Sequence, residues 1–161
     1  MRIGVFSDSH GDVSAAKRFF DSLAPLDCLF HLGDYAADGT KLAELFSCPV
    51  YAVRGNCDYR SDLPSELVVD LGGKRFLLLH GHQYYYMDAL FYRGDEVRAD
   101  MVLYGHTHVP DLSADGARLL LNPGSLSRPR GGSVESCALV LLEGNELNVR
   151  FVNTDNAKKS W

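Results

Sequence analysis

Residues 2–34 read RIGVFSDSHGDVSAAKRFFDSLAPLDCLFHLGD, and the pattern of this stretch indicates the fold class. An apolar segment stops at Asp8, a segment with apolar residues at helical spacing follows, and a second apolar segment stops at Asp34. Asp12 is placed to cap the helix, and Pro25 follows its end. Strand, helix and strand in this order are typical of a parallel βαβ unit, and strands this apolar suit a sheet buried on both faces.

The rest of the chain supplies further strands. In order, the patterns fit a helix, a strand, a hairpin turning at two glycines, a helix and four strands, within residues 38–46, 50–58, 66–82, 84–97, 100–108, 118–125, 135–144 and 146–152. The total is roughly nine strands and three helices. Because so many strands do not fit one flat sheet in a chain of this length, we expect an α/β fold with two packed sheets.

The totals describe one globular domain. The chain has 161 residues, of which 46% are hydrophobic and 23% charged, which is enough to bury a core. No repeat or linker marks a boundary. We therefore expect a single domain over residues 1–161, with a flexible tail over 154–161.

Composition also restricts the compartment and the partners. The longest apolar run, residues 137–142, is far shorter than the roughly 20 residues that cross a membrane, and the first residues meet charge too early for a signal peptide. The four cysteines form no CxxC pair, which indicates reduced thiols. We therefore expect a cytoplasmic protein without a membrane partner. A net charge of −5 and no basic stripe disfavour nucleic acid.

Polar side chains stand where five of the predicted strands end. They are two carboxylates, one amide and four imidazoles: Asp8, His10, Asp34, Asn56, His80, His106 and His108. In open α/β sheets, ligands bind outside the carboxyl ends of strands, so these side chains should converge. Mixed nitrogen and oxygen donors suit Mn²⁺, Fe²⁺, Zn²⁺, Co²⁺ or Ni²⁺. Seven donors are too many for one ion but fit two ions about 3.5–4 Å apart that share a carboxylate.

The motifs DxH, GD, GN-x-D, HGH and GHTH, in that order, resemble those of the calcineurin-like metallophosphoesterase superfamily. The short length and the segment VRGNCD are similar to its small bacterial and archaeal phosphodiesterases. The resemblance covers residues 8–130, nearly the whole chain. It implies a four-layer αββα sandwich, in which two mixed β-sheets are flanked by helices and carry a two-metal site at their strand ends.

The resemblance also implies a role for each donor. Asp8, His10 and His108 would hold one ion, Asn56, His80 and His106 the other, and Asp34 would bridge both. The implied enzyme is a metal-dependent phosphoric ester hydrolase. It would cleave a small-molecule phosphodiester by attack of a metal-bridging hydroxide, with Asp34, Asn56 and His80 as catalytic residues. We expect Mn²⁺ first, with Ni²⁺, Fe²⁺, Zn²⁺ and Co²⁺ as alternatives.

One position departs from the wider superfamily. Many members have a histidine that assists the leaving group where this chain has Cys57, and a thiol is a poor substitute for an imidazolium. The small phosphodiesterases do carry cysteine here, which leaves the leaving-group acid open. We expect Cys57 to line the site. Arg54, Asp58 and His82 are further candidates for contact with the substrate or the metal ligands, with a structural salt bridge as the alternative for Arg54 and simple surface exposure for His82.

Other conspicuous side chains have ordinary explanations. We expect His31 to pack behind the site rather than to bind metal. The segment NPGS (122–125) resembles a structural turn whose polar atoms can also support His10 or His108. The tyrosines at 84–86, with Phe91 and Tyr92, suggest a base-stacking platform, but aromatic residues in a helix beside a core usually pack.

Three other functions stay open at this point. The first is a protein-binding scaffold with a vestigial metal site, a use that the same fold has in a retromer subunit. The complete donor set weighs against it. The others are a phosphomonoesterase and a nuclease, and the charge disfavours the nuclease. An exposed edge strand also leaves a homodimer open.

Overall fold

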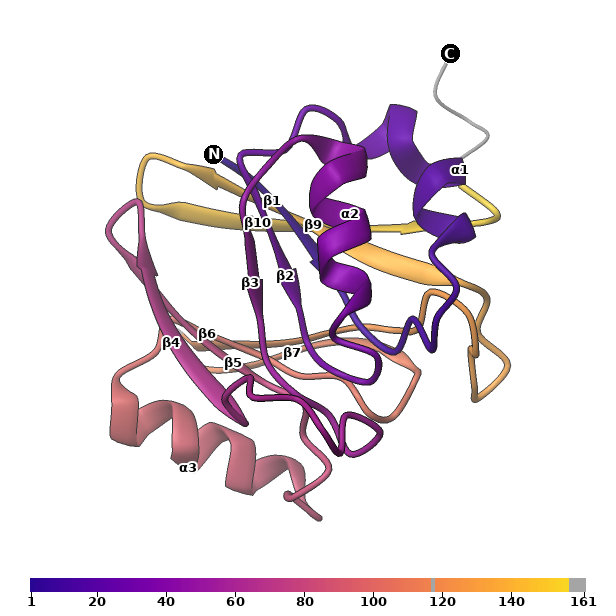
Figure 1. The fold of residues 1–161 in the computed structure, drawn as a ribbon. Helices are drawn as coiled ribbons and strands as arrows, with labels where there is room; N and C mark the ends of the chain where they lie inside the picture. The colour runs from indigo at the N-terminus through magenta and orange to yellow at the C-terminus, as the bar shows by residue number, and fades with distance from the viewer. Residues whose placement is uncertain (117, 157–161) are drawn as a thin grey trace.

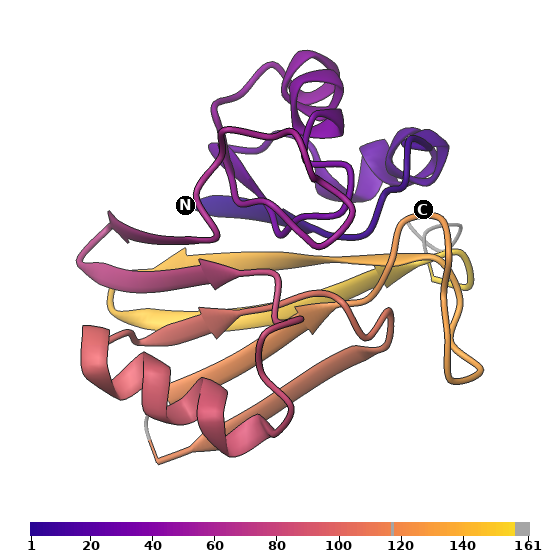
Figure 2. The same cartoon turned by 60° about the horizontal axis from the view of Figure 1, so that its bottom comes forward.

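Two five-stranded mixed sheets pack face to face in the computed structural model, which describes residues 1–116 and 118–156 (Figure 1). Helices cover the two outer faces, so the layers follow the order helix, sheet, sheet, helix when the molecule is turned (Figure 2). The αββα sandwich expected from the sequence is therefore confirmed.

The first sheet contains the N-terminal strands. Its order is β10-β9-β1-β2-β3, with β1, β2 and β3 parallel and β9 antiparallel to β1. Its strands are β1 (Arg2–Phe6), β2 (Cys28–His31), β3 (Val50–Ala52), β9 (Ser136–Glu143) and β10 (Glu146–Asn153). The helices α1 (Ser14–Leu23) and α2 (Asp38–Phe46) cover its outer face. Asp12 is not the cap expected from the sequence, because Val13 is the N-cap residue and no side chain caps the helix; the Asp12 carboxylate instead accepts a 2.8 Å hydrogen bond from the N–H of Ser14, the first helical residue.

The second sheet follows in the order β4-β5-β6-β8-β7. Its strands are β4 (Glu66–Leu71), β5 (Lys74–Leu79), β6 (Met101–Leu103), β7 (Pro110–Asp115) and β8 (Arg118–Pro123), and α3 (Met87–Val97) covers its outer face. Strands β5, β6 and β8 run parallel, so their carboxyl ends lie at one edge of the sheet. The sequence patterns missed β7. It is an edge strand that begins with a proline and has an irregular pattern of exposure, so it carries little periodic signal.

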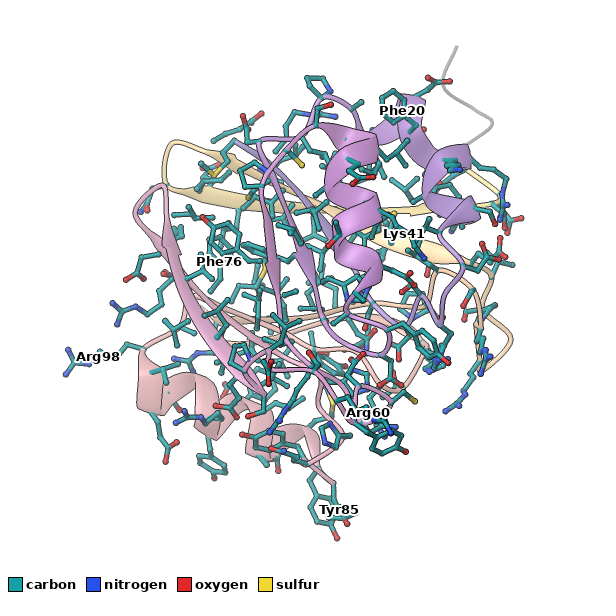
Figure 3. All side chains as sticks on the ribbon, viewed as in Figure 1. Phe20, Lys41, Arg60, Phe76, Tyr85 and Arg98 are labelled. Atoms are coloured by element: carbon teal, nitrogen blue, oxygen red, sulfur yellow. The ribbon has the colours of Figure 1, made fainter. Side chains whose placement is uncertain are left out.

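The main core lies between the sheets, and side chains alternate between its two sides. Along β5, Phe76 and Leu78 point into the space between the sheets, whereas Leu77 and Leu79 contact the α3 side (Figure 3 labels Phe76). All four are buried. Since each such side chain stabilises the fold by about 1.5–3 kcal/mol when buried, the sandwich is a firm support for the loops at its edge.

The segment before α3 differs from the prediction. The helix begins at Met87, so the three tyrosines precede it. Tyr84 and Phe91 pack against the core as expected. Packing is the wrong interpretation for Tyr85, Tyr86 and Tyr92, whose exposed fractions are 92%, 78% and 71%, because they lie on the outer side of the segment.

Two further expectations concern the ends and the membrane. Residues 157–161 of the expected tail lie outside the described residues, and residues 154–156 form a turn after β10. Among the described residues, no helix is long and apolar enough to span a membrane.

Candidate metal centre

The carboxyl ends of both sheets meet at one place, and the seven predicted donors lie there. Asp8 and His10 follow β1, Asp34 follows β2, Asn56 follows β3, His80 follows β5, and the pair His106 and His108 follows β6. Backbone hydrogen bonds join the loops, from the Asp8 N–H to the Gly33 carbonyl at 3.1 Å and from the Gly105 N–H to the His80 carbonyl at 3.0 Å. Donors from distant parts of the sequence thus share one rigid platform.

The backbone of these loops adopts a strained conformation at several of the predicted donors. Among the described residues, eight non-glycine residues have a positive φ, and five of them are predicted donors: Asp8, His10, Asp34, His106 and His108, with φ between 46° and 67°. Residues other than glycine rarely adopt this conformation, and it persists only where surrounding contacts enforce it. Gly33 and Gly55 make room for the turns, because a Cβ on either would collide with the neighbouring loop.

Four donors form the first half of the centre. One ligand atom from each of Asp8, His10, Asp34 and His108 lies within 4.8 Å of the others. His108 Nε2 is 3.1 Å from Asp8 Oδ1 and 3.5 Å from His10 Nε2, and His10 Nε2 is 3.9 Å from Asp34 Oδ2. Two carboxylates and two imidazoles at this spacing form a compact cation site.

The remaining donors form the second half, against Asp34. His80 Nε2 lies 3.1 Å from Asn56 Oδ1 and 3.4 Å from Asp34 Oδ1. The rings of His80 and His106 are edge to face, with centroids 5.2 Å apart. Asp34 therefore turns one carboxylate oxygen toward each half of the centre.

A buried oxygen tests whether a cation fits this arrangement. Asp8 Oδ1 is buried and has no hydrogen-bond partner among the described residues, although His108 Nε2 lies 3.1 Å away. His108 donates its Nδ1 proton to the Arg128 carbonyl at 2.5 Å, so a neutral ring directs its Nε2 lone pair at that oxygen. An unpaired buried carboxylate oxygen is costly. Either a cation must therefore lie between Asp8 Oδ1 and His108 Nε2, or the His108 ring must be protonated and donate from Nε2 to that oxygen. The residues fit a metal ion.

The protonation of two of the donors, His10 and His106, agrees with this. Burial, and secondly the positive charge of Arg128, lower the pKa of His10. Burial and the neighbouring His80 lower the pKa of His106. Both rings are thus neutral at neutral pH, which is the form that binds metal. Burial alone would lower the pKa of His108, but its contacts with Asp8 and the Arg128 carbonyl outweigh burial and raise it.

Behind the first half of the centre lies a hydrogen-bond network that the sequence patterns did not reveal. His31 is fully buried, and its Nδ1 accepts a 3.3 Å hydrogen bond from the Gly33 N–H, so its Nε2–H donates to Ser9 Oγ at 3.1 Å. The Ser9 hydroxyl donates to Asp38 Oδ2 at 2.8 Å, and the Gly11 N–H donates to the same oxygen at 2.8 Å. The expectation that His31 packs behind the site is thus confirmed.

Asp38 joins this network to the surface. Its other oxygen accepts a 2.6 Å hydrogen bond from Lys41, and Figure 3 shows Lys41 on α2. Burial would raise the pKa of Asp38, but the bonds from Lys41, Ser9 and Gly11 lower it. No sequence signal distinguished Asp38, because an acidic residue in the first turn of a helix is ordinary.

The segment 122–125 supports the centre as well as forming a turn. The Asn122 amide donates to the Gly105 carbonyl at 2.8 Å, and the Ser125 hydroxyl donates to the Asp8 carbonyl at 2.7 Å. On the other side, the Asp8 carboxylate oxygen Oδ2 accepts hydrogen bonds from Ser7 at 2.6 Å and from the His106 N–H at 3.1 Å. These bonds fix the loops that carry Asp8 and His106.

The four candidate contact residues differ in what they touch. Asp58 joins two loops, accepting bonds from the Gly55 N–H at 2.8 Å and the Ala36 N–H at 3.0 Å. Cys57 donates its N–H to Asp34 Oδ1 at 2.8 Å, while burial and the Asp34 carboxylate raise the pKa of its thiol to about 11.

Arg54 and His82 lie on the rim. Arg54 is exposed and makes no ion pair within the described residues, so the expected alternative of a structural salt bridge is wrong. His82 is half-buried beside His80, with ring centroids 5.4 Å apart, and its buried Nδ1 has no hydrogen-bond partner in the described part of the chain.

Comparisons of the sequence and of the structure with known proteins point to the same family. Residues 1–145 match the calcineurin-like phosphoesterase superfamily domain. The chain is 34% identical to the probable metallophosphoesterase YsnB of Bacillus subtilis (strain 168), over 94% of this chain and 90% of that protein. It is 31% identical to the phosphodiesterase YfcE of Escherichia coli (strain K12), over 95% and 93%. The crystal structure of a conserved Streptococcus pneumoniae TIGR4 protein, a predicted phosphoesterase, superposes with a TM-score of 0.80 at 34% identity, covering 96% of this chain and 90% of that one.

Proposed function

The chain belongs to the calcineurin-like phosphoesterase superfamily, and from that premise we propose that it is a metal-dependent phosphodiesterase acting on a small diester. The observation that carries the proposal is the completeness of the centre. Every donor that the motifs predict follows the end of a strand, four of them have ligand atoms within 4.8 Å of one another, and the buried Asp8 Oδ1 lacks a hydrogen-bond partner among the described residues. A vestigial site in a scaffold has no reason to keep such an arrangement, since it costs stability without a cation.

The contacts of His80 and Asn56 indicate what each would do in hydrolysis. Two divalent ions, when bound, supply a deprotonated water at neutral pH and neutralise the phosphoryl oxygens. The chain orients the donors: His80 donates its Nδ1 proton to the Leu32 carbonyl at 2.7 Å, which keeps Nε2 free to face Asn56 and Asp34. Among the described residues, Asn56 Nδ2 makes only a 3.5 Å contact with Cys57 Sγ, so it is available to donate to a phosphoryl oxygen.

Arginines around the centre support binding of an anion despite the net charge of −5. Arg54, Arg128 and Arg130 form no ion pairs within the described residues, and each lies close enough to act on a histidine of the site. After the larger effect of burial, the positive charges of Arg54 and Arg128 help to lower the pKa of His82 and His10, whereas that of Arg130 only partly offsets the contacts that raise the pKa of His108. Unpaired guanidinium groups beside a cation site attract phosphate esters.

The leaving group receives little help from Cys57. Hydrolysis adds water across a P–O ester bond, so a hydroxyl goes to phosphorus and a proton must reach the departing oxygen. With its pKa raised to about 11, mainly by burial, the Cys57 thiol stays protonated at neutral pH and is neither a nucleophile nor a strong acid. A diester with an aryl or other good leaving group makes the smallest demand for such an acid.

The test is metal-dependent turnover of a diester compared with a monoester. Protein stripped with a chelator and reloaded with Mn²⁺ is assayed on bis-p-nitrophenyl phosphate and p-nitrophenyl phosphate, beside Asp34→Asn and the control Asp21→Asn, an exposed carboxylate on α1. We expect diester turnover that requires metal, falls at least about 1,000-fold in Asp34→Asn, and is unchanged in Asp21→Asn.

Each other result has a distinct meaning. Preference for the monoester would make the protein a phosphomonoesterase. Calorimetric binding of Mn²⁺ without turnover of either ester would indicate a narrower substrate range. A chain that neither binds Mn²⁺ nor hydrolyses either ester would contradict the enzyme and favour a scaffold.

A further inference from the structure

A small cavity opens beside the second half of the centre, and four tyrosines contribute to its wall. We call it the tyrosine cavity; its volume is about 120 Å³, and its wall includes Tyr84, Tyr85, Tyr86, Met87, Tyr104 and His106. His106 is the one wall residue that also belongs to the predicted donor set. A group in this cavity therefore lies next to the position of the phosphoryl group.

The floor of the tyrosine cavity is rigid. Leu90 and Tyr104 are buried, and Tyr104 donates from its hydroxyl to Asp111 at 3.1 Å. Tyr84 is fixed by packing and by a 2.5 Å hydrogen bond from its hydroxyl to Glu66. These contacts position the apolar surfaces of the floor before any ligand arrives, which lowers the entropic cost of binding.

The outer wall, in contrast, has no structural task. Tyr85 and Tyr86 are 92% and 78% exposed, and neither side chain forms a hydrogen bond to a described residue. Figure 3 shows Tyr85 projecting away from the body of the fold near the start of α3. Adjacent exposed aromatic rings at the mouth of a cavity are suited to stacking on a planar ligand.

A second cavity beside the centre has a more polar lining. Its volume is about 320 Å³, and it is lined by Asn56 together with Arg54, Asp58, His82 and Gln83, with Tyr59 as its one tyrosine. A diester has two arms on one phosphorus. The more polar cavity suits a hydrogen-bonding or anionic arm, and the tyrosine cavity suits an apolar planar arm.

We propose that the tyrosine cavity binds one six-membered aromatic ring, an aryl group or a pyrimidine, carried on one ester arm of the substrate. The cavity, at about 120 Å³, is somewhat smaller than the apolar cavity of about 150 Å³ that encloses a benzene molecule, so it has room for no more than one ring. This inference rests on the proposed function, since it assigns the substrate arm of the same centre.

The test measures binding rather than turnover, with two phosphonates that differ only in the arm. Calorimetry on Mn²⁺-loaded protein compares phenylphosphonate with methylphosphonate in the unmodified chain, in Tyr85→Ala/Tyr86→Ala and in Tyr92→Ala. Tyr92 is the matched control, because it is an exposed tyrosine on α3 that does not line the tyrosine cavity. We expect the unmodified chain to prefer the phenyl compound by at least about fivefold, and the double variant to lose that preference.

Two comparisons complete the design. Tyr85→Phe/Tyr86→Phe should keep the preference, since the ring faces remain, and Tyr92→Ala should keep it as well. Equal affinity for both phosphonates in the unmodified chain, or a preference that survives in Tyr85→Ala/Tyr86→Ala, would overturn the inference even if bis-p-nitrophenyl phosphate is hydrolysed. A tyrosine-dependent preference in a protein that binds Mn²⁺ but does not hydrolyse bis-p-nitrophenyl phosphate would support the aromatic subsite without the turnover that the proposed function requires.

Discussion

The two halves of the metal centre differ in charge and in surroundings. In the first half, the carboxylate of Asp8 and the ring of His108 are buried, and the network behind Ser9 and Asp38 holds the loop. In the second half, the shared Asp34 is the one carboxylate among the predicted donors, and Asn56 and His106 border two cavities beside the centre. The difference indicates that the first half is built to retain a cation and the second to meet the substrate.

Charge alone predicts unequal affinities for the two ions. A site with Asp8 and Asp34 attracts a divalent cation more strongly than one with Asp34 and neutral donors, because carboxylates contribute Coulomb attraction that imidazole and amide do not. Removing a ligand from either half should therefore have different consequences for the affinity of the remaining ion but similar consequences for turnover.

The largest effect is expected from His106→Ala and His108→Ala, compared side by side. Each should lose one of two ions and at least about 1,000-fold in diester turnover, because the ions act together on the phosphoryl group. Titration with Mn²⁺ should show that the ion left in His106→Ala binds more tightly than the ion left in His108→Ala. If both variants retained two ions, the assignment of one ion to each half would be contradicted. Circular dichroism would check that each variant is folded.

A smaller effect should follow from Asp38→Asn, which touches no predicted donor side chain. The loss of a charged acceptor for Ser9 and Gly11 should loosen the loop of Asp8 and His10, and lower Mn²⁺ affinity about 10- to 100-fold in the first half only. The control is Asp70→Asn, which removes an exposed partner of Arg75. An equal loss of affinity at both ions would mean that the network supports the whole centre.

The neutral state of His31 allows a pH test of the same network. Burial lowers the pKa of His31 from 6.5 to about 4, so the unfolded chain binds a proton between these values that the folded chain does not. Stability must then fall as the pH drops from 6.5 toward 4, by about 2 kcal/mol between pH 7.5 and 5.0 from this group.

Urea unfolding of chelator-treated protein at pH 7.5 and 5.0 would measure the effect of His31. Other histidines also contribute to the slope, so the informative quantity is the difference between the unmodified chain and His31→Gln. We expect the variant to lose about 2 kcal/mol less over this interval. An identical loss in both proteins would show that His31 is not held neutral.

The donors could be predicted from the sequence because each ends a strong apolar strand, and parallel strands place their carboxyl ends together. The residues that form hydrogen bonds behind the donors could not be predicted from the sequence. Asp38 is an acidic residue at a helix start and Ser9 lies between two donors, and only the packing of α2 against the first sheet brings them together. The strand β7 was missed for a related reason, because an edge strand without alternation depends on its neighbour β8 rather than on its own pattern.

Cys57 provides the smallest predicted effect and the sharpest check on the second half. Its contact with the centre is made by the backbone N–H, which donates to Asp34 Oδ1, and the thiol is protonated at neutral pH. Cys57→Ala preserves that backbone bond, so turnover of an aryl diester should change by no more than about twofold. With an alkyl leaving group, the same variant tests whether the thiol donates the proton. A large loss confined to the alkyl diester would assign Cys57 as the leaving-group acid and place chemistry, not only substrate binding, in the second half.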